Sequence, residues 1–348
     1  MTLLWPDTPE NVRAKIQAIE YHLPEPVLDN EQLAADLPGW DAQKIESKTG
    51  IRRRHIARES ECASDLAVAA GKKLLATGVC GCSSIDYFLL CTQSPDYFLP
   101  TTACLVHQRL GLPASCGAFD INLGCSGFVY GLSTAKGLIE SGQAGNVLLI
   151  TADTYSKFIH PEDRSVRTIF GDGAAATLIT SVASETDIIG PFIFGTDGAG
   201  AANLIVPAGG LRRRTVCNPD ITEDENGNRR TANHLYMNGA EIFEFTLRTV
   251  PATVTNLLAK ARISAGAIDY WVFHQANRYM LTHLCNTLHL PREKFIISME
   301  DCGNTVSSSI PIALRNLQES GRLLAGHTLA LVGFGVGYSW AGTLVRWM

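Results

Sequence analysis

Cys125 is the side chain with the clearest capacity for chemistry in this sequence. It lies in the segment 119–128 (FDINLGCSGF), whose pattern predicts a strand, a tight turn and a helix that begins near residue 126. A thiol at a helix start faces unpaired backbone N–H groups and the positive end of the helix dipole, which favour the thiolate and lower the pKa. Small neighbours at Gly124 and Gly127 leave room for a substrate. Cys125 is therefore a candidate nucleophile, and the competing interpretation is a buried structural cysteine.

His274 and Asn304 are the candidate partners of this nucleophile. His274 ends the apolar strand in 271–278 (WVFHQANR), at a sheet edge of the kind where α/β sites form. A lone histidine there is more often structural, but beside a nucleophile it can act as an acid, a base or a hydrogen-bond donor. Asn304 lies in 303–311 (GNTVSSSIP), where helix N-capping alone could explain an asparagine. Its amide could instead stabilise charge on a thioester oxygen without titrating.

A glycine-rich turn follows the last predicted core strand. The segment 333–338 (GFGVGY) allows a backbone N–H to approach a ligand closely. That N–H could join the N–H of Cys125 to form an oxyanion hole, and Val336 in the middle of the turn is the expected contributor. Because Val336 is not glycine, its φ is expected to be negative. A dinucleotide-binding interpretation fails, because no helix and acidic residue follow these glycines.

The sequence contains an internal repeat. The segment 85–93 (IDYFLLCTQ) recurs as 268–275 (IDYWVFHQ), an offset of 183 residues from 85 to 268. The motif Glu-Ser-Gly at 140–142, which ends a helix before a strand, recurs at 319–321, an offset of 179 residues from 140 to 319. The strand that follows each of these motifs, 146–151 and 328–333, is a third match. Each match is weak alone, but three short matches in the same order indicate two similar halves.

The offset of 179 residues connects two of the candidate residues. Asn304 stands 179 positions after Cys125, and each is expected at the start of a helix in its own half. If the halves pair about a pseudo-twofold axis, the two side chains could meet. The duplication therefore predicts a site between the halves.

Both halves read as strands alternating with helices. Such continuous apolar strands predict an α/β protein with a parallel or mixed sheet covered on both faces. We expect an N-terminal half over 1–185 and a C-terminal half over 186–348, with 205–233 as a surface excursion over a site. The expected helices are 62–76, 126–142, 238–264 and 305–320.

Composition excludes several other classes of protein. The 348 residues are 46% hydrophobic and 18% charged, with a formal charge of −5, so nucleic-acid binding has little support. The ten cysteines show no zinc-ligand spacing, and no metal site is expected. No apolar run approaches the roughly 20 residues of a membrane span. No signal peptide is recognisable, and we expect a reduced, cytoplasmic protein without a membrane partner.

Taken together, these segments resemble the β-ketoacyl-acyl-carrier-protein synthase III family. The resemblance rests on LGCSGF at 123–128, HQAN at 274–277, GNT at 303–305 and GFGVG at 333–337, with support from TGIR at 49–52 and FGDGA at 170–174. It runs in order from about residue 15 to the C-terminus. It implies the five-layered αβαβα thiolase fold, usually as a homodimer.

The resemblance also implies a mechanism. Cys125 would take an acyl group from acyl-CoA or acyl-acyl carrier protein. His274 and Asn304 would stabilise the carbanion formed when malonyl-acyl carrier protein loses carbon dioxide. The N–H groups of Cys125 and Val336 would hold the tetrahedral oxyanion while a 3-oxoacyl product forms. Such an acyltransferase needs no metal or redox cofactor, only CoA and carrier-protein thioesters as substrates.

Substrate-binding positions follow from the same resemblance. The matching residues are Arg52, Arg164, Gly239, Phe243, Asn277 and Phe334, with Leu99 at the wall of the acyl pocket. Family members often stack the CoA adenine between a tryptophan and an arginine. Lys44 occupies the tryptophan position, and Trp40 lies one helical turn earlier. Glu244 replaces a common lysine at the expected carrier-protein contact. Leu99 replaces a common phenylalanine, which could admit a longer or more branched acyl group.

Two other functions remain open at this point. One is transfer of the acyl group from Cys125 to a hydroxyl or amine of another metabolite, although such acyltransferases often lose the asparagine that Asn304 provides. The other is a catalytically silent subunit, which would lack one of the three candidate catalytic residues. A specialised condensing role is open beside the initiation of fatty-acid synthesis.

Overall fold

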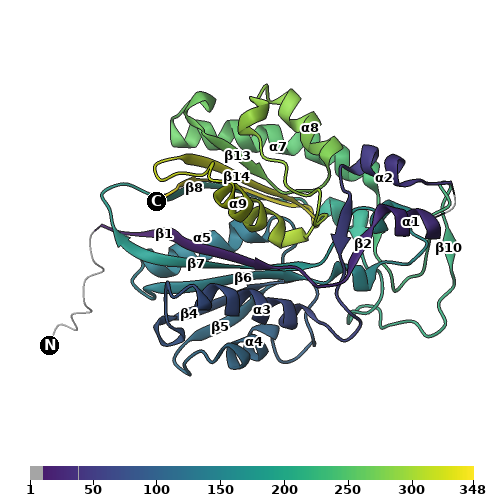
Figure 1. The fold of residues 1–348 in the computed structure, drawn as a ribbon, viewed down its shortest axis with the longest axis horizontal. Helices are drawn as coiled ribbons and strands as arrows, with labels where there is room; N and C mark the ends of the chain where they lie inside the picture. The colour runs from purple at the N-terminus through teal and green to yellow at the C-terminus, as the bar shows by residue number, and fades with distance from the viewer. Residues whose placement is uncertain (1–10, 38) are drawn as a thin grey trace.

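Two β-sheets form the frame of the molecule (Figure 1). The computed structural model describes residues 11–37 and 39–348. The strands of the first sheet are β1 (Val12–His22), β4 (Tyr87–Cys91), β5 (Gly117–Ile121), β6 (Asn146–Asp153) and β7 (Gly173–Ala183). Those of the second sheet are β8 (Ile189–Thr196), β13 (Tyr270–Phe273), β14 (Thr328–Gly335) and β15 (Ser339–Arg346).

The two sheets share one topology. The first has the order β1-β7-β6-β4-β5, in which β4, β5 and β6 run parallel while β7 runs antiparallel to both β1 and β6. Reading from β8, the second has the order β8-β15-β14-β13, with the parallel pair at β14 and β13. An isolated parallel bridge from Trp271 to Phe295 occupies the place that β5 has in the first sheet. The chain leaves the first sheet at Ala183 and enters the second at Ile189. The boundary between 185 and 186 stays a prediction.

Helices cover both sheets and separate them. They are α1 (Asn30–Asp36), α2 (Ala42–Thr49), α3 (Ala63–Ala76), α4 (Thr102–Leu110), α5 (Gly127–Glu140), α6 (Arg164–Arg167), α7 (Gly239–Ala261), α8 (Arg278–Thr287) and α9 (Ser309–Glu319). α3 and α4 pack on the outer face of the first sheet, α7 and α8 pack on the outer face of the second, and α5 and α9 lie between the sheets. The predicted five-layered αβαβα arrangement is confirmed.

The central layer is the largest apolar core. Phe128 and Leu132 of α5 and Leu314 of α9 pack there against strand residues of both sheets, such as Leu149 and Leu331. Both helices are therefore covered on two sides near their starts, where nearly all residues of 127–132 and all of 309–314 are buried. Because α5 and α9 occupy equivalent places in the two halves, the segments that precede them reach the same end of the sheets.

The predicted helices agree closely with the observed ones except near Asn304. α9 begins at Ser309, because residues 306–308 form a separate 3-10 turn. Thus Asn304 lies in a non-helical loop five residues before the helix, and its side chain does not cap α9.

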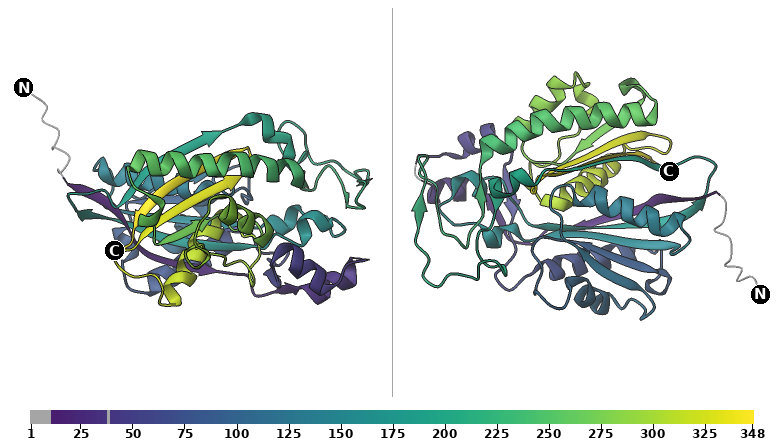
Figure 2. Two further views of the ribbon diagram at one scale, coloured as in Figure 1. Left: turned by 90° about the horizontal axis from the view of Figure 1, so that it is seen from above. Right: turned by 180° about the vertical axis from the view of Figure 1, so that it is seen from behind.

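Smaller elements gather at one end of the molecule. β2 (Val27–Asp29) pairs with β3 (Arg53–His55) beside α1 and α2. The excursion 205–233 carries a hairpin of β10 (Thr222–Glu223) and β11 (Arg229–Arg230), and short strands β9 (Leu204–Ile205) and β12 (Tyr236–Met237) pair at its base. Figure 2 shows these elements at the same end, with α7 running along the outer face of the second sheet. Across the described residues, no helix is long and apolar enough to cross a bilayer.

Candidate active site

Cys125, His274 and Asn304 line one cavity between the two halves. Cys125 lies between β5 and α5, His274 directly follows β13, and Asn304 precedes the 306–308 turn. All three border a cavity of about 80 Å³, whose other walls are mostly apolar. Its remaining lining residues are Ile169, Phe170, Leu204, Met237, Gly239, Ile242, Ala276, Asn277, Met280, Phe334 and Gly335.

Two glycines of β14 allow the halves to come this close. A Cβ atom added at Gly335 would lie 2.8 Å from both the Cβ and the Sγ of Cys125. A Cβ atom at Gly333 would lie 2.8 Å from the carbonyl oxygen of Cys125. Because these distances are far below van der Waals contact, no other residue fits at either position without moving the nucleophile's turn.

The thiol of Cys125 is neutral at neutral pH, contrary to the sequence-based expectation of a lowered pKa. Burial, and then the charge of Asp153, raise its pKa to about 12. The backbone N–H groups of Val336 and of Cys125 itself act in the opposite direction. The closed cavity thus outweighs the helix start. The two opposing N–H groups are the pair expected to form an oxyanion hole, and Val336 is not among the residues with positive φ.

His274 is held as a neutral ring with a defined tautomer. It is 2% exposed, and burial lowers its pKa to about 3 although the backbone of Val306 favours the charged form. Its Nδ1 lies 2.7 Å from the Oγ of Ser309, and that oxygen accepts a hydrogen bond from the N–H of Gln275. The Ser309 hydroxyl proton is then free to be donated to Nδ1, which leaves the proton of the ring on Nε2. His274 can therefore act as a neutral hydrogen-bond donor.

The amide of Asn304 is also oriented by its surroundings. Its Oδ1 accepts a hydrogen bond of 2.9 Å from the N–H of Val306, so its Nδ2 group is the part left to donate. The backbone of Asn304 bridges to the other half, because its N–H donates to Ile169 and its carbonyl accepts from Gly171. Val306 is buried at φ 53°, in the left-handed region that β-branched residues avoid. The loop is thus held in a strained conformation beside the cavity.

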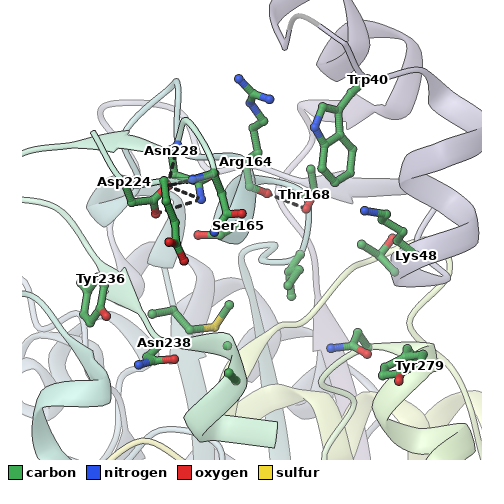
Figure 3. A pocket seen from close by; sticks show the side chains of 18 residues that line it. Trp40, Lys48, Arg164, Ser165, Thr168, Asp224, Asn228, Tyr236, Asn238 and Tyr279 are labelled. Carbon is green, nitrogen blue, oxygen red and sulfur yellow. Dashed lines mark hydrogen bonds between the residues drawn. The ribbon is translucent and has the colours of Figure 1, made fainter. Parts of the chain in front are cut away.

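A wider vestibule leads to this cavity. It has a volume of about 660 Å³ and shares Ile169, Met237, Gly239 and Asn277 with the inner cavity. Figure 3 shows Trp40 and Lys48 on one side, Asp224 and Asn228 on the other, and Arg164 between them. The vestibule is polar and its inner end is apolar, so an extended molecule with a polar head could reach Cys125.

Some of the predicted substrate-binding residues lie at the vestibule or the inner cavity, and others do not. Four of them line the vestibule, the cavity or both: Arg164, Gly239, Asn277 and Phe334. Phe334 also packs edge-on against His274, with ring centroids 5.7 Å apart.

Three others line neither the vestibule nor the inner cavity in the single chain, and their role in substrate binding stays a prediction. Phe243 stacks on Tyr279, one shell behind the vestibule. Arg52 is paired with Asp301 at 2.9 Å. Leu99 is 86% exposed on a surface loop.

Several residues of the site cannot be recognised from the sequence. Ser309 falls within a predicted helix, and its role depends on a histidine 35 positions away. Phe170 belongs to a family motif without an assigned role, yet it lines the cavity. Trp40 lies outside the family's tryptophan position, but it lines the vestibule together with Arg164. No local sequence signal marks these residues, because their positions depend on the packing of distant segments.

A buried carboxylate lies close to these groups. Asp153, at the end of β6, has no exposed surface, and burial raises its pKa to about 7. The ionisable groups whose pKa depends on its charge are Cys91, Cys125 and Tyr155. Asp172 is the nearby acid that raises the pKa of Asp153 itself.

Replacing Asp153 with asparagine should make Cys125 more reactive. The ionised carboxylate raises the pKa of the thiol, so its removal should raise the thiolate fraction above neutral pH. We expect alkylation of Cys125 by iodoacetamide at pH 8 to be about threefold faster or more in Asp153→Asn. Peptide-resolved mass spectrometry measures this rate, with exposed Cys104 and Cys217 as internal references. An unchanged rate at Cys125 would show that the carboxylate does not influence the thiol.

Comparison with known proteins agrees with this arrangement. The model of the 3-oxoacyl-[acyl-carrier-protein (ACP)] synthase III family matches residues 119–198, and that of the C-terminal part of the same family matches 258–347. A β-ketoacyl-[acyl-carrier-protein] synthase III of Clostridium perfringens is 37% identical, over 96% of this chain and 99% of its own length.

Solved structures lead to the same group of proteins. A crystal structure of a 3-oxoacyl-(acyl-carrier-protein) synthase III has a TM-score of 0.95 at 54% identity, covering 96% of this chain and 100% of that one. The priming β-ketosynthase of the R1128 polyketide pathway has a TM-score of 0.84 at 27% identity, with 98% of each chain covered. With this similarity along nearly its whole length, the chain belongs to the 3-oxoacyl-acyl-carrier-protein synthase III family and is a condensing enzyme of the thiolase fold.

Proposed function

We propose that this protein is an acyltransferase that condenses an acyl thioester with malonyl-acyl carrier protein to give 3-oxoacyl-acyl carrier protein. The observation that carries the proposal is the meeting of Cys125, a neutral His274 and an oriented Asn304 at one buried cavity. A nucleophile alone would serve many acyl transfers. Two fixed N–H donors facing the same cavity suit a carbanion that develops on a thioester.

In the first half-reaction, the sulfur of Cys125 attacks the carbonyl carbon of the acyl thioester. The N–H groups of Cys125 and Val336 hold the oxyanion of the tetrahedral intermediate. The carbon–sulfur bond of the substrate then breaks, and the departing thiolate takes the proton that Cys125 loses. Because the thiol is neutral at rest, one proton has to pass from the sulfur of Cys125 to the sulfur of the leaving group within this half-reaction.

In the second half-reaction, malonyl-acyl carrier protein loses carbon dioxide. The electron pair of the broken carbon–carbon bond moves onto the thioester, whose oxygen accepts hydrogen bonds from Nε2 of His274 and Nδ2 of Asn304. The carbanion attacks acyl-Cys125, and collapse of the second tetrahedral intermediate releases the 3-oxoacyl product. The thiolate of Cys125 then takes a proton from water. The carbon dioxide that leaves makes the reaction favourable without a metal or redox group.

The walls of the inner cavity suit the hydrocarbon part of an acyl group. Leu204, Phe170 and Ile242 are among its apolar lining residues.

The central test is a two-step mass measurement. The protein is incubated with acyl-CoAs and acyl-acyl carrier proteins from two to eight carbons, and then with malonyl-acyl carrier protein. We expect a mass gain that is absent in Cys125→Ala, followed by release of carbon dioxide and loss of the adduct. Asn304→Ala should still form the adduct, but decarboxylation should fall by about 100-fold, as for loss of an oxyanion donor.

Other outcomes of this measurement decide between the candidate functions. An adduct that ignores malonyl-acyl carrier protein but discharges to an alcohol or amine would replace condensation with acyl transfer to another metabolite. No adduct with any donor, despite intact fold, would contradict the assignment of Cys125 as the nucleophile.

Trp40 and Arg164 support CoA as the carrier of the primer. Both line the vestibule at the mouth of the channel to Cys125. Lys48 also lines the vestibule, and its ammonium lies 4.9 Å from the centre of the Trp40 ring, which places positive charge beside this surface. Thus Trp40 can supply the aromatic surface for stacking that family members often have at the position of Lys44. The same vestibule would take the prosthetic arm of acyl carrier protein in the second half-reaction.

Replacement of Trp40 tests this binding site. Loss of a stacked base should raise the KM for acetyl-CoA by about tenfold in Trp40→Ala. The rate of acylation by the acetyl thioester of N-acetylcysteamine, which has no nucleotide, should be unchanged and serves as the control. An equal loss with both thioesters would contradict adenine binding at Trp40.

We further propose that the protein is a homodimer in the cytoplasm. The neighbouring Tyr97, Phe98 and Leu99 are 61%, 66% and 86% exposed, an apolar patch of the kind that marks an interface. Because Leu99 lies outside its own acyl pocket, it could reach such a pocket only in a second copy. All ten cysteines are unpaired, which supports a reducing compartment.

A charge placed in this patch should disrupt the dimer. We expect Leu99→Asp to shift the mass measured by light scattering from twice the chain mass of 37.6 kDa toward that of one chain. Exposed Leu324 lies outside the patch, so Leu324→Asp is the matched control. A wild-type protein that is monomeric at all concentrations would contradict the proposal.

A further inference from the structure

The site is assembled from two halves, and something must keep them in register. Cys125 belongs to the N-terminal half, whereas Asn304 lies in a loop of the C-terminal half. The backbone of Asn304 is tied to Ile169 and Gly171, but its side chain depends on the peptide of Val306. What fixes that peptide therefore fixes the direction of the Asn304 amide.

Asp153 binds the residue that follows Val306. Its Oδ2 accepts a hydrogen bond of 2.5 Å from the hydroxyl of Ser307, and its Oδ1 accepts one of 2.8 Å from the N–H of Gln93. Gln93 follows β4, so the carboxylate joins the ends of β4 and β6 to the Asn304 loop. The side chain of Gln93 lies over Gly124, since its Oε1 would be 2.4 Å from a Cβ atom there. Asp153 thus contacts both sides of the site without lining the cavity.

The contact of Asp153 with Ser307 can hold the neighbouring Val306 in its strained conformation. A buried valine at φ 53° is in a strained conformation, which persists only where neighbouring contacts enforce it. If Ser307 were released, the turn could relax toward a more common conformation. The N–H of Val306 would then turn away from Oδ1 of Asn304, and the amide would lose its orientation.

We propose that Asp153 is a positioning residue, which holds the amide of Asn304 in its working direction through Ser307. The proposal rests on the condensing function proposed above, because the oriented amide serves the malonyl step. It gives Asp153 no contact with substrate. A carboxylate suits this task because it accepts hydrogen bonds from both halves at once and binds them more strongly than a neutral group would.

This role predicts a defect in one half-reaction only. Acylation uses Cys125 and the oxyanion hole, neither of which depends on the Asn304 amide. Decarboxylation uses that amide directly. Loss of the contact between Asp153 and Ser307 should therefore slow the malonyl step and leave formation of acyl-Cys125 intact.

Ser307→Ala is the variant that tests the inference, and Ser308→Ala is its matched control. Ser308 lies in the same turn and also binds β6, since its Oγ donates 3.0 Å to the carbonyl of Thr151. It has no bond to Asp153. We expect malonyl decarboxylation to fall by about tenfold in Ser307→Ala, with acylation within about twofold of wild type. Ser308→Ala should remain within about twofold of wild type in both steps.

A double-mutant cycle shows whether Asp153 acts through Ser307. Asp153→Asn alone should slow decarboxylation, because an amide offers Ser307 a weaker acceptor. In the Ser307→Ala background the same change should cost much less, since only the long bond of 3.5 Å from the N–H of residue 307 to Oδ2 of Asp153 remains. Thermal unfolding of all four proteins separates these effects from a general loss of structure.

Three results would overturn the inference. The first is an equal loss of both half-reactions in Ser307→Ala, and the second is an equal loss in Ser308→Ala. The third is a double-mutant cycle in which the effects of Asp153→Asn and Ser307→Ala on decarboxylation simply add. Failure of the proposed function is a different result, because wild-type protein would then not decarboxylate malonyl-acyl carrier protein at all. In that case a change in the hydrogen–deuterium exchange of residues 303–309 in Ser307→Ala, absent in Ser308→Ala, still reports whether Asp153 holds the loop.

Discussion

The site depends on the burial of α5 and α9 between two sheets. Each helix has apolar neighbours on both sides, so neither can shift without opening the central core. Because the halves share a topology, this packing brings the segments before α5 and α9 to the same end of the molecule. Cys125 and Asn304 meet there because of this constraint. The glycines of β14 complete the approach by leaving no side chain between the strand and the nucleophile's turn.

Burial also sets the electrostatics of the site. Burial opposes charge on either partner, so the pKa of Cys125 rises and that of His274 falls, and both are neutral at rest. The groups that remain are fixed dipoles: two backbone N–H groups, the Nε2–H of the ring and the amide of Asn304. Such dipoles are most effective where water is excluded and charge develops only during the reaction. The cavity is thus suited to stabilising transient anions.

The vestibule has a different character, because it is lined by charged and polar residues from several peripheral elements. Trp40 comes from the loop before α2, Arg164 from α6, and Asp224 from the hairpin of the excursion. Arg230 holds this hairpin in place, since its guanidinium bonds to both Asp163 and Asp224. The buried pair of Arg230 and Asp163 lies beside Arg164, so the excursion forms an ordered wall of the vestibule.

Whereas the five layers follow from the family resemblance, the alternation of strands and helices, the repeat and the three candidate catalytic residues can be predicted from the residues themselves. These features leave local traces, since buried parallel strands are continuous apolar runs and duplicated halves repeat at a fixed offset. Position along a strand or before a helix then places Cys125 and His274 at a sheet edge. The family resemblance added the reaction, but the symmetry of Cys125 and Asn304 was visible without it.

How these residues behave depends on the packing of the folded chain. The raised pKa of Cys125, the Ser309 partner of His274 and the contact of Asp153 with Ser307 each join segments that are far apart in the chain. Leu99 is a further example. The family resemblance places it at the wall of the acyl pocket, but it is exposed in the single chain and could reach such a pocket only in a second copy. Burial and electrostatic environment are properties of the packed molecule. They depend on contacts between distant segments that form only when the chain folds, so the local sequence does not reveal them.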